Sequence, residues 1–84
     1  MVMPTVVVFR GFRVRVHFVE DGEGPHVHVF KGGREYRIRL LSHAAVLMTD
    51  GGREKATAAE AREAVRIVEQ HLLDCWREWL KWHR

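Results

Sequence analysis

The last third of the chain constrains the fold most strongly, because its pattern fits only one kind of element. Residues 57–60 read as a capping box, in which Thr57 and Glu60 each satisfy a backbone N–H at the start of a helix. Neither proline nor glycine interrupts the chain from there to Trp82, and apolar residues recur at alternating steps of four and three: Ala61, Val65, Val68, Leu72, Cys75, Trp79 and Trp82. The pattern predicts one amphipathic helix over residues 57–82.

Upstream of this helix the apolar residues recur with a period of two, which is typical of strands that bury one face. The segments 12–18 and 36–40 alternate without a fault, and 5–10 is a β-branched run. Glycine-containing turns separate these segments. Residues 44–49 fit either a short strand or a helical turn, and we favour a strand. We therefore expect strands over residues 5–10, 12–19, 26–31, 35–41 and, as a short fifth, 44–49.

These elements predict a single α+β domain over residues 1–84, in which an antiparallel meander of about four strands packs against one long C-terminal helix. The single cysteine, Cys75, excludes an internal disulfide and favours a reducing, cytoplasmic location. No apolar run approaches the roughly 20 residues that span a bilayer, so we expect no membrane partner. The net charge of +3 favours an anionic partner.

The segment from Asp21 to Val29 links the two alternating strands and contains two histidines. Gly22, Gly24 and Pro25 are turn residues that end one strand and start the next. Side chains alternate along a strand, so His26 and His28 share one face while the valines that follow each of them take the other. We expect the valines to enter the core and both histidines to point away from it.

The segments Met3-Pro4-Thr5 and Gly-Pro-His-Val-His-Val, followed by a tryptophan-bearing helix, resemble the small bacterial family called domain of unknown function 4160. Members often carry two prolines before the first histidine, and sometimes a further histidine a few residues earlier. This chain has Gly24-Pro25 and an acidic run, Asp21 to Glu23, at those positions. The resemblance implies a toxin–antitoxin-like pair, with a small partner protein encoded nearby.

The outward faces of the predicted strands collect basic residues into one surface. If neighbouring strands pair in sequence order, this surface suits the phosphate backbone of RNA or DNA, or an acidic protein. The alternative is that these residues only solvate the open face of a two-layer domain. The surface comprises Arg13, Arg15, His17, His26, His28, Arg37 and Arg39.

The three histidines of this surface allow two further interpretations. His26 and His28 could hold a zinc ion, with His17 on the neighbouring strand as a third ligand. The same residues could act as an acid/base pair in RNA cleavage, because imidazole titrates near neutral pH. The sequence does not decide whether the protein is an enzyme, and a small ribonuclease or metal-dependent hydrolase is the alternative to a binding role.

The leading interpretation is a small cytoplasmic interaction module with two surfaces. Its histidine- and arginine-rich sheet face would meet an anionic partner or nucleic acid. The tryptophan-rich end of its helix would meet a partner protein or a second copy of the chain, because tryptophan contributes strongly to interfaces. We assign Trp76 and Trp82 to that second surface and Trp79 to the core.

Overall fold

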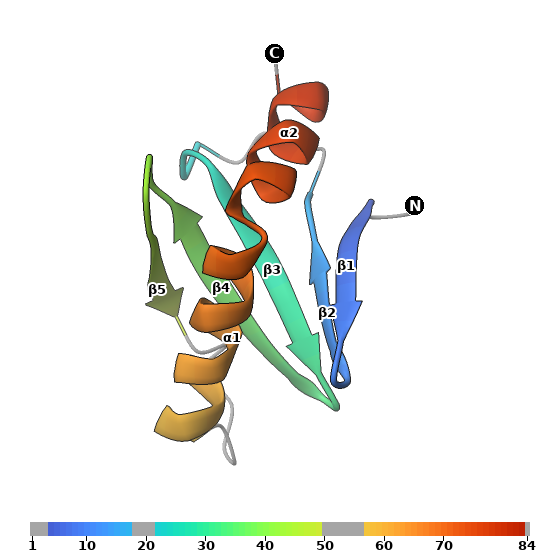
Figure 1. Cartoon of the computed structure of the whole chain (residues 1–84), viewed down its shortest axis with the longest axis vertical. Coiled ribbons are helices and arrows are strands. Elements are labelled where there is room, and N and C mark those ends of the chain that lie inside the picture. The colour runs from blue at the N-terminus through green and yellow to red at the C-terminus, as the bar shows by residue number, and fades with distance from the viewer. Residues whose placement is uncertain (1–3, 18–21, 50–56, 84) are drawn as a thin grey trace.

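A five-stranded antiparallel sheet lies against two C-terminal helices in the computed structural model, which describes residues 4–17, 22–49 and 57–83 (Figure 1). Neighbouring strands follow one another in sequence, in the order β1-β2-β3-β4-β5. The strands are β1 (Thr5–Phe9), β2 (Phe12–Arg15), β3 (His26–Lys31), β4 (Arg34–Leu40) and β5 (Ala45–Thr49), and the helices are α1 (Ala58–Gln70) and α2 (Leu72–Trp82). The α+β class and the antiparallel meander are confirmed, with the favoured short strand as β5.

The strand ends differ from the prediction by local geometry. β1 ends at Phe9 because Arg10 and Gly11 both adopt positive φ, 51° and 82°, which makes a two-residue hairpin turn of the kind that matches strand twist. β2 ends at Arg15 and not at residue 19, although the N–H of Val16 still donates to the carbonyl of Pro4 at 3.0 Å. Residues 18 and 19 lie outside the described part of the chain. β4 runs over 34–40, one residue earlier than predicted at each end.

The core lies between the sheet and the helices, where the period-two pattern placed it. The apolar alternate residues of β2, β3 and β4 that face the helices are at most 3% exposed. The helices contribute small and β-branched side chains, which allow a close approach to the sheet. The core residues are Phe12, Val14, Val16, Val27, Val29, Tyr36, Ile38, Leu40, Ala45, Ala61, Ala64, Ile67, Val68 and Cys75.

The prediction of one long helix is wrong at a single residue, His71, which separates α1 from α2. The Ile67 carbonyl accepts from both the His71 ring at 2.9 Å and the His71 backbone N–H at 3.2 Å, so the side chain shares the acceptor of the helical hydrogen bond. His71 adopts φ −119° and ψ 29°, outside helical geometry. The apolar stripe nevertheless continues, since Val68 and Cys75 on either side are both fully buried.

The helix start follows half of the predicted capping box. The Thr57 hydroxyl accepts from the backbone N–H of Glu60 at 3.0 Å, as an N-cap does. The Glu60 carboxylate, however, accepts hydrogen bonds from Arg34 and from the hydroxyl of buried Tyr36. The start of α1 is therefore fastened to β4. In the described part of the chain, no helix is long and apolar enough to cross a membrane.

Candidate functional site

The sheet face opposite the helices carries every histidine and arginine that the sequence assigned to it. Pairing places Arg15, His28 and Arg37 directly opposite one another across β2, β3 and β4. His26 lies opposite Arg39 in the next pairing position on this face. We call this surface the basic face; it comprises Arg13, Arg15, His17, His26, His28, Phe30, Glu35, Arg37 and Arg39, with Glu23 at its edge.

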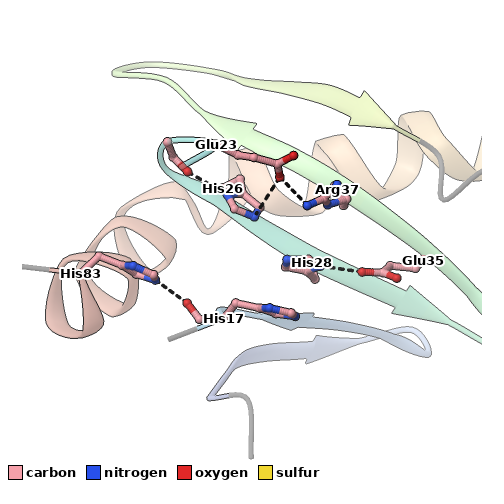
Figure 2. A network of polar contacts seen from close by, with 8 residues as sticks. His17, Glu23, His26, His28, Glu35, Arg37 and His83 are labelled. Atoms are coloured by element: carbon pink, nitrogen blue, oxygen red, sulfur yellow. Dashed lines mark hydrogen bonds and ion pairs between the residues drawn. The ribbon is translucent and has the colours of Figure 1, made fainter. Parts of the chain in front are cut away.

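His28 lies at the centre of the basic face and is 3% exposed. Its Nδ1–H donates to the Glu35 carboxylate at 2.5 Å (Figure 2). Its Nε2 is buried and has no hydrogen-bond partner among the described residues. Burial lowers the pKa of His28 below its ordinary value, although the hydrogen bond to Glu35 acts in the opposite direction. His28 is therefore a neutral imidazole at neutral pH, with its proton on Nδ1.

The other two predicted histidines contact His28 directly. The His17 ring stacks on the His28 ring, with centroids 3.8 Å apart and planes at 14°. The centroid of the His26 ring lies 5.0 Å from that of His28. The Nδ1–H of His26 donates to the Gly24 carbonyl at 2.8 Å, and its Nε2 lies 3.8 Å from the Glu23 carboxylate (Figure 2). The structure thus brings the three histidines together, as predicted.

The histidine pair points away from the core, as predicted, but it is buried on its own face of the sheet. His26 and His28 lie on the face opposite the core valines, but they are only 4% and 3% exposed. The stacked ring of His17 and the carboxylates of Glu23 and Glu35 contact the pair on its own side of the sheet. Alternation fixes the face on which a side chain lies. It does not determine which long neighbours cover that side chain.

The four arginines of the basic face differ in what they contact. Arg13 and Arg39 are exposed, whereas Arg15 and Arg37 are half-buried. Arg37 donates to the Glu23 carboxylate, and the Arg15 guanidinium lies 5.8 Å from the centre of the Phe30 ring. Four arginines thus stand against two glutamates, Glu23 and Glu35, so the described face carries net positive charge even with neutral histidines.

Three members of the basic face were not among the predicted site residues: Glu23, Phe30 and Glu35. The sequence of the turn, Lys31 to Gly33, indicates where two of them, Phe30 and Glu35, lie. A tight hairpin there sets Phe30 opposite Glu35, which brings Glu35 within diagonal reach of His28. Glu23 lies in the segment before β3, where no periodic pattern indicates which way a side chain points.

The residue that follows α2, His83, contacts the segment that follows β2. The His83 ring donates from Nε2 to the backbone carbonyl of His17 (Figure 2). The Trp79 ring stacks on His83 with centroids 4.5 Å apart. Trp79 packs against the core, as predicted, and Trp76 also packs against it while its indole N–H donates to the Leu41 carbonyl at 2.9 Å. Trp82 is 44% exposed.

Among residues 4–17, 22–49 and 57–83, no group of three or more histidine, cysteine, aspartate or glutamate side chains is arranged to hold a metal ion. The Nδ1 atoms of His26 and His28 are occupied by the Gly24 carbonyl and the Glu35 carboxylate. Any zinc bound by this pair would therefore use the Nε2 atoms, and it would need a further ligand from elsewhere.

The lowered pKa of His28 predicts an acid-sensitive fold. Between the folded pKa and the ordinary value of 6.5, the unfolded chain binds a proton that the folded chain does not. The contribution of His28 to stability is therefore complete above pH 6.5 and is lost as the pH falls below it. The hydrogen bond from Arg34 lowers the pKa of Glu60. The contribution of Glu60 to stability is therefore lost only below its ordinary pKa of 4.5.

Urea unfolding of the wild type and of His28→Gln between pH 7.5 and pH 5.5 checks this sign. The wild type should lose stability across the range, and His28→Gln should lose less. His43→Gln, at an exposed position, is the matched control and should follow the wild type. Equal slopes in all three proteins would contradict a buried, neutral His28.

Comparison with known proteins finds one family. A family model described as "Domain of unknown function (DUF4160)" matches residues 11–79 of the chain. That span contains β2 to β5, α1 and most of α2, and so it includes the whole basic face. Searches of curated proteins and of solved structures give no match.

Proposed function

Because this chain belongs to the DUF4160 family, whose description gives no activity, we propose its function from the geometry of the basic face. We propose that the protein binds single-stranded nucleic acid on this face. The observation that carries the proposal is the exposure of Arg13 and Arg39 on the sheet face opposite the helices, with half-buried Arg15 and Arg37 between them. Such arginines raise the affinity of a protein for nucleic acid, because they pair with phosphate groups and release the bound counterions.

The aromatic rings of the face favour a single strand over a purely electrostatic partner. His17, His28 and Phe30 are nearly parallel, with 14° between the planes of each neighbouring pair. His17 and Phe30 are half-buried, so part of each ring is open to solvent. Sheet surfaces that bind single-stranded RNA combine such rings, on which bases stack, with basic side chains that contact the backbone. An acidic protein surface would use the arginines and leave the rings unused.

A second surface, on α2, supports pairing with another protein. Leu73 and Leu80, two turns apart on one side of the helix, are 63% and 51% exposed, and Trp82 at the end of the helix is 44% exposed. We propose that a small partner protein, as in a toxin–antitoxin-like pair, or a second copy of the chain covers this helix. The toxin–antitoxin element of the proposal rests on the family resemblance alone.

A catalytic role is the second candidate, and one observation favours it. The Glu35 carboxylate fixes the tautomer of His28, and the adjacent His17 is a second imidazole. A carboxylate–imidazole pair of this kind can serve as a general base for a ribose hydroxyl. If the protein cleaves RNA, replacing His28 should abolish cleavage, while replacing one arginine should only slow it.

Nuclear magnetic resonance tests the binding proposal. Titration of ¹⁵N-labelled protein with a single-stranded RNA of about ten nucleotides, within the length that one small domain covers, should shift the backbone amides of β2, β3 and β4. Amides on the outer side of α2, near Arg77 and Lys81, should move little. Shifts concentrated on the helices, or none at low salt, would contradict the proposal.

A further inference from the structure

We propose that the basic face selects RNA over DNA, and that the ribose 2′-hydroxyl donates a hydrogen bond to Nε2 of His28. This inference rests on the proposed nucleic-acid binding and specifies its substrate class. It depends on the hydrogen-bonding capacity that folding leaves unused at the centre of the face.

The unused capacity of His28 is that of an acceptor. An ionised carboxylate can only accept, so the 2.5 Å hydrogen bond to Glu35 requires the proton of His28 to be on Nδ1. In the neutral imidazole Nε2 is then a lone pair. That atom is buried and has no hydrogen-bond partner among the described residues. A buried acceptor without a partner costs free energy unless a ligand donates a hydrogen bond to it. The ligand group that fits is a donor, such as a hydroxyl.

Arg15 supplies an unused hydrogen-bond donor beside His28. The two residues are direct partners across β2 and β3, on the same face. The Arg15 Nε–H is a donor, and it too is buried without a hydrogen-bond partner in the described structure. One acceptor and one donor therefore lie on adjacent strands. A ribonucleotide matches both, because its 2′-hydroxyl donates to His28 while a phosphate oxygen accepts from Arg15. A deoxyribonucleotide satisfies only the arginine.

One face of the His28 ring is covered by His17, whose ring centroid lies 3.8 Å from that of His28. His17 follows the end of β2 and is half-buried. Its backbone carbonyl is held by His83, whereas its ring has only a stacking contact with His28 among the described residues. Rotation of the His17 side chain would uncover this face of the His28 ring, and exposed side chains rotate rapidly. A nucleic-acid base can then take the stacking position that the His17 ring leaves.

Three strands of one sequence test the inference: RNA, DNA and 2′-fluoro RNA. The 2′-fluoro strand keeps the sugar conformation of RNA but cannot donate. The wild type should bind RNA about tenfold more tightly than either of the others, the size expected for one or two hydrogen bonds to buried groups. Because only the ligand changes, this comparison does not depend on a variant that folds.

His28→Phe keeps a ring in place and removes the acceptor, so it should bind the three strands equally. Arg62→Ala, on the helix side of the domain, should keep the RNA preference. Equal wild-type affinity for RNA and 2′-fluoro RNA, or a preference retained in folded His28→Phe, would overturn the inference while leaving nucleic-acid binding intact. Failure of all three strands to bind would overturn the proposed function together with it.

Discussion

Replacing Ile67 by alanine should lower the free energy of unfolding by about 3 kcal/mol, within the range for truncating a buried isoleucine. Ile67 is fully buried on the side of α1 that faces the sheet. The substitution removes methyl and methylene groups from the core and leaves a cavity that rigid strands cannot close. For a domain of this size, such a loss is a large part of the total stability. Urea unfolding monitored by tryptophan fluorescence measures it.

Leu73→Ala is the matched control, because it also truncates an aliphatic helix residue. Leu73 is 63% exposed, so its replacement should change stability by no more than about 0.5 kcal/mol. A loss of similar size in both variants would mean that the buried side of the helices is misassigned. A large loss for Leu73→Ala alone would show that α2 is covered in solution, as the proposed partner surface requires if the occupant is a second copy.

Much of the fold could be predicted because burial follows period. In β2 and β4 the alternation of apolar and basic residues assigned every core position correctly, from Phe12 to Leu40. The turn glycines separated the strands at nearly the right places. The break at His71 could not be predicted in this way, because the apolar stripe continues through it from Val68 to Cys75. The break coincides with a hydrogen bond between the His71 ring and the Ile67 carbonyl, which the apolar pattern does not indicate.

The candidate site was predicted in position but not in environment. Alternation and strand order were enough to gather His17, His26 and His28 on one face. The burial of that group depends on the carboxylates of Glu23 and Glu35, which act through long side chains. Their reach depends on register and rotamer, and neither is encoded in a binary pattern of apolar and polar residues. The acceptor at His28 Nε2 follows from these contacts, so sequence reasoning could not find it.

The same contacts explain how charge is divided on the basic face. Arg37 is engaged by Glu23, and Arg15 lies against Phe30, while Arg13 and Arg39 remain exposed. The inner pair is therefore held in position within the sheet layer, and the outer pair is available to a long anionic ligand. A single strand that follows this face would meet Arg13 and Arg39 with its phosphates and the inner residues with its sugars and bases.

The salt dependence of RNA binding by two double variants tests this account most directly. Arg13→Ala with Arg39→Ala removes the exposed charges of the basic face. Arg62→Ala with Arg77→Ala removes the same charge from exposed positions on the helices. Each lost phosphate contact should lower the slope of log affinity against log salt by about 0.7 for a single strand. The sheet variant should therefore lose about 1.4 in slope and about 25-fold in affinity at 0.1 M salt.

The helix variant should keep nearly the wild-type slope, since its arginines lie on the other side of the domain. That result, beside a large loss in the sheet variant, is what nucleic-acid binding by the basic face predicts. Equal losses in the two variants would mean that net charge alone attracts RNA to the protein. An unchanged slope in the sheet variant would contradict nucleic-acid binding by the basic face.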